Sequence, residues 1–567
     1  MFSGRPLSLH EARLPQVSRE MMQTGDWLIP QSGGRPWLER PPFPHWCTVA
    51  VSFLFRQHAD QVWVVRLPAA LAGCVTVLLS AWMAARLFGR WTGICSGLVL
   101  ATAFEFYTYS CLAEDDIFLA ALVAAVMALF VGLEFPGGTN RDERTGFFGS
   151  RPWAMAALFV MLGLTNLAKG PLVGAAVVIA TIGAFLLPMR DWPRLRRYIW
   201  LWGWLLFLAV SAAWPLAVYH QFHAEALDNW KFDYKGTSEF DNPFWYYPVQ
   251  LLGALAPWTP AVFLGLWQTA SKSKRSSASP ERFLWCWAIL PILVLSIPHR
   301  KHHHYLVPSL APWAILASLG LRDVARSMFD GPLWSRKPLF GFIVFGLPGA
   351  AAIILFHTVK FDSKTSDSLL MSVFLAVGWL FCVVTFYLGL LRQNGRIVMG
   401  TFVTGLALAY CWGHRFIPDR ATQEDTFFLQ RVEAEVPRDG LLFINSDLHG
   451  ELDFFREGFY LRKDARLLHN LTFLRDEKIT AASAYVLTRE WDEPKLASLG
   501  RIEIVDQSTK SRPSQHAKNL KTSKERFTLY RLTFDPHLAR YPAPTHISTM
   551  QAMGRLKGPY CGPELPE

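Results

Sequence analysis

Charged residues are scarce in this chain of 567 residues, because Asp, Glu, Lys and Arg together make up only 18% of it, whereas hydrophobic residues make up 51%. Paired cysteines are also lacking. None of the eight cysteines forms a CxxC motif, and seven lie in or beside apolar stretches. Structural zinc sites and disulfide frameworks need spaced cysteine pairs, so neither is expected to organise the fold. Isolated thiols of this kind behave as small apolar residues.

Long apolar runs take the place of charge. They recur between Arg66 and Trp412, and each has about 20 residues, enough to cross roughly 30 Å of hydrocarbon. The sequence therefore predicts a polytopic α-helical membrane protein with about twelve transmembrane helices. They are expected at residues 66–87, 91–111, 116–134, 152–168, 171–188, 198–219, 244–267, 283–298, 303–321, 338–357, 368–391 and 397–412.

The loop charges suggest an orientation. Lys and Arg fill one set of alternate loops, such as Arg190–Arg197, and the opposite set holds acidic segments such as Glu114–Asp116. The basic loops are expected in the cytoplasm, so the net charge of +11 is no sign of nucleic-acid binding. Both chain ends then lie on the outer, periplasmic face of the cytoplasmic membrane. Only the basic segment His299–His304 breaks the trend on that face.

Three regions follow from this arrangement: an outer-face re-entrant loop with interfacial helices at 1–65, a transmembrane region at 66–418, and a C-terminal region at 419–567. Met1–Phe43 has no apolar helix that could export it, so we expect one more helix upstream, which gives thirteen in the full pattern. Short strands at 441–444, 484–487 and 526–532 alternate with amphipathic stretches, which predicts a small periplasmic α/β domain without a catalytic role. The tail 542–567 is expected to be irregular.

The opening segment carries acids, bases and paired prolines directly before the apolar runs. Such residues cannot lie in hydrocarbon, so the segment must rest on the membrane surface or cap a cavity in the helix bundle. Pro44–Phe55 is apolar but short, which favours an interfacial helix over a span.

Several motifs in this segment and beyond it resemble those of the ArnT-like lipid-dependent glycosyltransferases, members of the GT-C superfamily related to protein O-mannosyltransferases. The matching residues keep their family order between Pro6 and Leu321. They are Glu11–Arg13, Arg19–Met21, Thr24–Pro30, Leu38–Pro42, Arg66–Gly73, Asp116–Leu119, Leu167–Pro171, Asn242–Tyr247, Leu255–Trp258 and Lys301–Pro308.

The resemblance implies an integral-membrane enzyme that transfers one sugar from a polyprenyl-phosphate donor to a lipid, glycan or protein acceptor on the outer membrane face. Cationic side chains would stabilise the charge that develops on the departing phosphate. A carboxylate would accept the acceptor's proton or hold a metal ion. A divalent metal ion is therefore a candidate cofactor, whereas no nucleic-acid partner is expected.

Four residues are candidates for catalysis. Asp116 matches a family aspartate at the head of a membrane helix, with Asp115 as its alternative, although helix capping would also explain an acid there. His10 and Glu11 stand where the family commonly has Asp-Glu. A histidine can still accept a proton near neutral pH. Solvated loop charges are the alternative interpretation for this pair.

The resemblance also implies a phosphate site. Glu39 and Arg40 match a family Glu-Lys pair whose cation contacts the lipid phosphate, and a guanidinium adds a bidentate fork suited to phosphate oxygens. Lys301 and Tyr305 match the family's phosphate-binding residues. Lys169, in a short turn, matches a family Lys-Gly-Pro. Interfacial anchoring would account equally for Arg40 and Lys169.

Two further groups are weaker candidates. Trp230, Lys231 and Trp245 lie in the large outer loop and can stack on a sugar or contact phosphate, but aromatic residues are common at membrane interfaces. His302, His303 and His304 can be considered as metal ligands, although adjacent histidines on a turn rarely share one ion.

Two other kinds of protein remain compatible with the sequence. A transporter or flippase of a lipid-linked anion would normally show internal repeats and helices broken at the membrane midplane. A non-catalytic relative would bind polyprenyl lipid without turnover, and the replacement of a family acid by His10 favours that alternative. Consumption of the donor separates an enzyme from both.

Overall fold

The computed structural model describes residues 6–537 with gaps. The positions outside the description are 1–5, 9, 33–34, 56–60, 136–150, 171, 236–241, 299–300, 331–342, 344–346, 348–349, 352–365, 417–419, 446–454, 462–464, 469–470, 472–473, 475–480, 490–491, 510–511, 514–523 and 538–567. The predicted span at 338–357 lies mostly outside the described residues, and the tail 542–567 lies wholly outside them.

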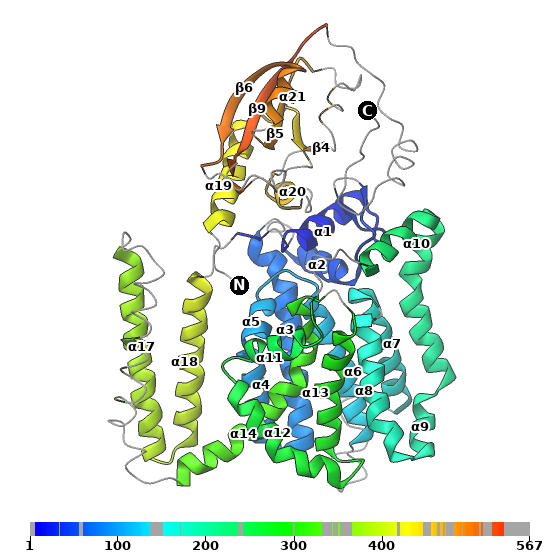
Figure 1. Cartoon of the computed structure of the whole chain (residues 1–567), viewed down its shortest axis with the longest axis vertical. Coiled ribbons are helices and arrows are strands. Elements are labelled where there is room, and N and C mark those ends of the chain that lie inside the picture. Colours follow the sequence, from blue (N-terminus) through cyan, green and yellow to red (C-terminus); the bar gives the residue numbers. More distant parts are fainter. Residues whose placement is uncertain are drawn as a thin grey trace.

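Helices form wherever the other long apolar runs occur, and most of them stand roughly parallel in one bundle (Figure 1). Their bounds are α3 (Val62–Phe88), α4 (Arg90–Ala101), α5 (Phe104–Ser110), α6 (Asp116–Glu134), α7 (Arg151–Lys169), η3 (Leu172–Ala176), α8 (Val177–Leu186), η4 (Leu187–Met189), α9 (Trp192–Tyr198), α10 (Leu201–Lys235), α11 (Tyr246–Ala254), α12 (Thr259–Arg275), α13 (Pro280–Ser296), η6 (His303–Ser309), α14 (Leu310–Asp330), α17 (Ser366–Leu391) and α18 (Gly395–Phe416).

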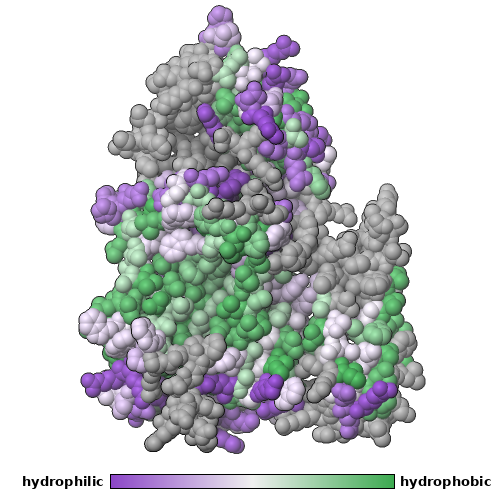
Figure 2. All heavy atoms as spheres, turned by 180° about the vertical axis from the view of Figure 1, so that it is seen from behind, coloured by the Kyte–Doolittle hydropathy of each residue, from purple (hydrophilic) through white to green (hydrophobic). Residues whose placement is uncertain are grey.

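The bundle has the surface of a membrane protein. On the face shown in Figure 2, hydrophobic side chains cover the middle of the bundle, and hydrophilic ones gather towards both ends. Within the described residues, five helices are long and apolar enough to span a membrane, or six if the bent pair α11–α12 counts as one span. The chain is therefore a helical multi-pass membrane protein, and the full count of twelve spans stays a prediction.

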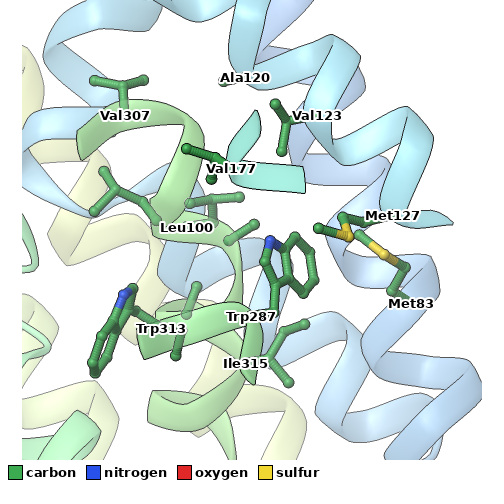
Figure 3. Packing of buried hydrophobic residues seen from close by; sticks show 14 of the residues in the cluster. Met83, Leu100, Ala120, Val123, Met127, Val177, Trp287, Val307, Trp313 and Ile315 are labelled. Carbon is green, nitrogen blue, oxygen red and sulfur yellow. The ribbon is translucent and has the colours of Figure 1, made fainter. Parts of the chain in front are cut away.

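Large apolar side chains from distant parts of the sequence fill the centre of the bundle. Met83 of α3, Met127 of α6 and Trp287 of α13 lie close together there, with Ile315 of α14 beside them (Figure 3). All four side chains are at most 1% exposed. Dispersion contacts of this density hold membrane helices together, because lipid supplies little hydrophobic driving force.

Two of the predicted spans are interrupted. α4 ends at Ala101 and α5 begins only at Phe104, while α11 and α12 meet at 113°. The two breaks face each other, since the Phe104 N–H donates to the Ala256 carbonyl (2.9 Å) and the Trp258 indole N–H donates to the Thr102 hydroxyl (3.0 Å). Backbone freed inside a membrane needs such partners, so each break is stabilised by the other.

The opening segment lies across one end of the bundle (Figure 1). It contains α1 (Arg13–Thr24), a small hairpin of β1 (Gln31–Ser32) and β2 (Arg35–Pro36), and α2 (Phe43–Leu54). A helix therefore forms over most of the apolar segment 44–55, and its interfacial position stays a prediction. Two indole N–H groups from α10 hold the hairpin region in place: Trp214 donates to the Leu28 carbonyl and Trp230 to the Leu38 carbonyl, each at 3.0 Å.

The chain after α18 forms a five-stranded sheet in the order β4-β3-β5-β9-β6. The inner three are β3 (Leu442–Asn445), β5 (Ser483–Arg489) and β9 (Phe527–Phe534), and the edges are β4 (Arg466–Leu468) and β6 (Gly500–Gln507). β3 pairs in parallel with β4 and β5, whereas β9 runs antiparallel to both of its neighbours. α19 (Arg420–Glu435), α20 (Phe455–Tyr460) and α21 (Glu493–Ala497) accompany the sheet, and β7 (Arg512–Pro513) pairs with β8 (Lys524–Glu525).

Helix α20 joins the sheet region to the opening segment. Phe455 and Phe459 pack against Leu7 and Val17, and the Tyr460 hydroxyl accepts a hydrogen bond from the Leu7 N–H at 2.8 Å. The sheet therefore lies over the opening segment, which itself covers the bundle (Figure 1).

Candidate functional site

The site begins at the head of α6, directly beneath the opening segment. Asp116 Oδ1 lies 2.5 Å from the Lys169 ammonium at the end of α7, and both side chains are at most 4% exposed. The same ammonium lies 4.6 Å from the centre of the Tyr305 ring in η6. One buried cation thus joins three segments that are far apart in the sequence, through an ion pair to Asp116 and a cation–π contact to Tyr305.

The three consecutive histidines continue the site along η6. His304 Nε2 lies 3.9 Å from Asp116 Oδ2, and His303 Nε2 lies 3.8 Å from Glu105 Oε1 of α5. His303 also shares a hydrogen bond of 3.1 Å with the Tyr109 hydroxyl. The His302 and His304 rings are stacked, with their centres 5.2 Å apart.

The acids before α6 are electrostatically coupled to the opening segment. Burial raises the pKa of Asp115, while the positive charges of Arg40 and Lys169 lower it again. Burial raises the pKa of Glu114 to about 8, and the negative charges of Asp116 and Glu11 add to the rise. Such coupling requires proximity, so the cation at position 40 lies near the acids at the head of α6.

Glu11 is held away from solvent. Its two carboxylate oxygens accept hydrogen bonds from Arg66, at 2.8 Å from Nε and 3.1 Å from Nη2, and both side chains are fully buried. The Ser8 N–H donates to the same carboxylate at 3.0 Å. This bidentate geometry fixes the opening segment onto the start of α3 and leaves Glu11 little freedom to reach a substrate.

His10 remains at the surface of the opening segment beside the cationic side chains. Desolvation by the surrounding chain is the main cause that lowers its pKa; the positive charges of Arg13 and Arg40 act in the same direction, Glu39 opposes them, and the resulting pKa is about 4. The imidazole is therefore neutral at pH 7 and able to accept a proton. Arg40 itself pairs with Glu39 at 3.3 Å, and both side chains are only partly exposed.

Lys301 is buried and ties two outer loops together. Its ammonium donates to the Asn242 carbonyl at 2.9 Å, and the Asn242 amide donates back to the Lys301 carbonyl at 3.2 Å. Lys301 directly precedes His302–Tyr305 in the sequence and therefore lies next to the site. It takes no part in the ion pair between Asp116 and Lys169.

The aromatic candidates of the large outer loop are dispersed. Trp230 packs on Trp214, with ring centres 6.0 Å apart, and supports the opening segment through the bond to Leu38. Trp245 is 65% exposed at the start of α11. Lys231 lies in α10, and its side chain is outside the described residues.

Within the part of the chain that the structure describes, no group of three or more His, Cys, Asp or Glu side chains is arranged to hold a metal ion. The three histidines present their rings to different partners, as expected for neighbours on a tight turn.

Sequence reasoning missed two participants. Arg66 appeared only as the start of a helix, although a charged residue at the end of an apolar run calls for a partner. Glu105, in an apolar stretch between two aromatic residues, carries the same signal. Both signals are visible in the sequence, but the partner of each residue is not.

Known proteins resemble this chain in sequence and in fold. The model of the family described as dolichyl-phosphate-mannose-protein mannosyltransferase matches residues 15–228. An undecaprenyl phosphate-alpha-4-amino-4-deoxy-L-arabinose arabinosyl transferase from Edwardsiella ictaluri is 29% identical over 61% of this chain and 60% of its own length. Its counterpart from Aeromonas salmonicida is 28% identical over 66% of this chain and 67% of its own. The match to the Edwardsiella protein thus spans about 60% of that relative.

Solved structures give the fold. The crystal structure of ArnT from Cupriavidus metallidurans bound to undecaprenyl phosphate superposes with a TM-score of 0.70 at 20% identity, covering 95% of this chain and 96% of that one. The apo form of the same protein gives 0.69 at 21% identity, covering 93% and 94%. The two structural matches show that the fold is shared, and together with the family model and the sequence relatives they confirm the resemblance to ArnT-like glycosyltransferases that the motifs indicated.

Proposed function

We propose that this chain is an integral-membrane glycosyltransferase that transfers a sugar from a polyprenyl-phosphate donor to an acceptor hydroxyl. The observation that carries the proposal is the convergence of Asp116, Lys169 and Tyr305 at the end of the bundle, under the lid formed by α1 and α2. The shared fold with ArnT bound to undecaprenyl phosphate supports a lipid-phosphate ligand at this place.

The role proposed for the cations is to stabilise the phosphate as it leaves the sugar. When the bond between the sugar C1 and the phosphate oxygen breaks, negative charge grows on the phosphate, and nearby cations stabilise it. Arg40, supported by Glu39, supplies a guanidinium with two donors to the phosphate, and Lys169, oriented by Asp116 and Tyr305, supplies an ammonium. Lys301 keeps the neighbouring loops in register and adds positive charge.

His10 is the proposed base. It is neutral, solvent-accessible and close to Arg40, so it can take the proton of the acceptor hydroxyl as the hydroxyl oxygen attacks C1. Asp115 is the alternative base at the same place. Glu11 acts as a positioning residue, because its bonds to Arg66 hold the loop that carries the imidazole.

The names of the relatives indicate the finer chemistry. We infer a pentosyl transfer, with a 4-amino-4-deoxy-arabinose unit on undecaprenyl phosphate as the donor and a lipid as the favoured acceptor; a glycan or protein acceptor is the alternative. Trp245, exposed at the start of α11, is a candidate for stacking on the acceptor, and Lys231 of α10 remains a candidate for contacting sugar or phosphate.

The proposed orientation places the site on the outer face of the cytoplasmic membrane. The basic segments at α9 and at the end of α12 lie at the opposite end of the bundle from α1 and α2 (Figure 1). By the positive-inside rule that end faces the cytoplasm. The proposal keeps a loop region at 1–65, a twelve-span region at 66–418 and a periplasmic region at 419–567.

Transfer of labelled sugar by the purified protein tests this function. In proteoliposomes supplied with labelled undecaprenyl-phosphate aminopentose and a lipid acceptor, we expect release of undecaprenyl phosphate and labelled acceptor. A transporter would move the donor between leaflets without consuming it, and a non-catalytic relative would bind it without change. Either result would refute the proposal.

A further inference from the structure

A cavity of about 220 Å³ lies where the two helix breaks meet. Phe104 and Glu105 line it from α5, Gln250 from α11 and His303 from η6. Its size is below the roughly 300–1,000 Å³ of pockets for drug-sized ligands. It therefore suits a single small ring rather than a lipid chain or a peptide. Irregular backbone inside a membrane protein is typical where it lines such a cavity.

Glu105 provides this cavity with a hydrogen-bond acceptor. The residue is only 8% exposed, and among the described residues its Oε1 atom has no hydrogen-bond donor. His303 Nε2 lies 3.8 Å from this oxygen, which is beyond hydrogen-bonding distance. A buried carboxylate oxygen without a donor is costly, so a ligand that brings a donor would be favoured there.

The surroundings favour a positively charged donor. The neighbouring acid Asp116 is already neutralised by Lys169, whereas Glu105 has no comparable ion pair among the described residues. The Phe104 ring on the cavity wall favours a cation as well. A metal ion fits less well, because Glu105 and His303 provide only two side chains of the kind that bind metals, and zinc sites need three or four.

We propose that this cavity holds the sugar of the donor, and that Glu105 accepts a hydrogen bond from a protonated amino group on that sugar. The inference rests on the proposed function and names its specificity residue. Gln250 has both a donor and an acceptor for the ring hydroxyls. His303 lines the cavity 3.8 Å from Glu105, and the adjacent His304 lies 3.9 Å from Asp116, the ion-pair partner of Lys169. The cavity is therefore a neighbour of the Asp116–Lys169 pair.

Donor discrimination tests the proposal. The purified protein is assayed with undecaprenyl phosphate carrying 4-amino-4-deoxy-arabinose, with its 4-hydroxy analogue and with its N-acetylated form. A hydrogen bond to a charged group contributes about 1.5–3 kcal/mol, so we expect wild type to prefer the amino donor in kcat/KM by about 10- to 100-fold. The Glu105→Gln variant should lower that ratio to near one.

Glu134→Gln serves as the matched control, because Glu134 is a buried acid at the far end of α6 that binds Arg194 and Tyr198. It should keep the wild-type ratio. Wild type that turns over all three donors equally would overturn the inference and leave the proposed function standing, even if Glu105→Gln did not fold. Discrimination that survives Glu105→Gln, or that disappears on chelation of metal ions, would also overturn it. No turnover of any donor would contradict the proposed function itself.

Discussion

Glu11 and Arg66 illustrate how single residues determine the site without touching substrate. Both are fully buried, and their two hydrogen bonds join the opening segment to α3. Removal of one partner from a buried pair leaves an uncompensated charge, at a cost of about 3–5 kcal/mol. Glu11→Ala should therefore lower the melting temperature markedly, as measured by fluorescence in detergent.

The double variant Glu11→Leu with Arg66→Met removes both charges and should recover much of that stability. It should not recover activity if the pair positions His10. A single variant as stable as wild type would show that the pair does not form.

His10 should give kcat a characteristic dependence on pH. With a pKa near 4 the imidazole stays neutral as the pH falls from 7 to 5, and its function as a base is lost only as the pH approaches 4. We expect kcat to hold through this range, whereas a base with the ordinary pKa of about 6.5 would lose roughly tenfold by pH 5.5. His10→Ala should reduce kcat by about 100-fold or more without weakening donor binding. His10→Asp, which restores the acid common in the family, should have a kcat between those of His10→Ala and wild type. Full activity in His10→Ala would refute the assignment.

Glu114 is expected to determine how the affinity for undecaprenyl phosphate changes at alkaline pH. Its pKa of about 8 lies above the ordinary value of 4.5, so the carboxyl is neutral at pH 7 and ionises as the pH rises through 8. The same shift means that its contribution to stability is present below about pH 4.5 and lost progressively up to pH 8. Ionisation adds negative charge near a phosphate ligand. Undecaprenyl phosphate should thus bind more weakly at pH 9 than at pH 7, and Glu114→Gln should reduce this dependence. An identical pH profile in both proteins would contradict it.

At the scale of elements, the apolar runs predicted where helices form, because length and hydropathy determine a membrane helix locally. They did not predict the breaks at 102–103 and 255–258. Those breaks depend on hydrogen bonds between residues about 150 positions apart in the sequence, namely Phe104 with Ala256 and Thr102 with Trp258. The motifs likewise indicated Asp116 and Lys169 but not that they pair, nor that Arg66 would bind Glu11. Contacts between residues far apart in the sequence cannot be predicted from local sequence patterns.

Helices α12 and α14 show a contact that tolerates no side chain. A Cβ atom added at Gly265 would lie 1.9 Å from the Leu316 carbonyl oxygen, so Gly265→Ala must push the helices apart. We expect a lower melting temperature. Gly183→Ala is the control, since a Cβ there meets nothing within 4 Å, and alanine favours the helix by about 0.5–1 kcal/mol. Equal stability of the two variants would show that α12 and α14 do not pack this closely.

The whole molecule has three layers along its length: the bundle, the lid of α1 and α2, and the sheet (Figure 1). The opening segment is held by indole groups of α10, which bind the chain between α1 and α2, and by α20, which packs against α1. The site lies where the lid meets the bundle. Under the proposed function, this placement would let an acceptor approach from the aqueous side while the polyprenyl chain of the donor remains in lipid.

The affinity for undecaprenyl phosphate tests the central claim, a lipid-phosphate site formed by the cations under the lid. Its dissociation constant should be measured in nanodiscs for wild type, for Arg40→Ala and for Lys274→Ala, an exposed cation near the end of α12. We predict that Arg40→Ala weakens binding about tenfold or more, as expected for loss of a charge-assisted hydrogen bond, while Lys274→Ala leaves it unchanged. Equal affinities in all three proteins would contradict the account.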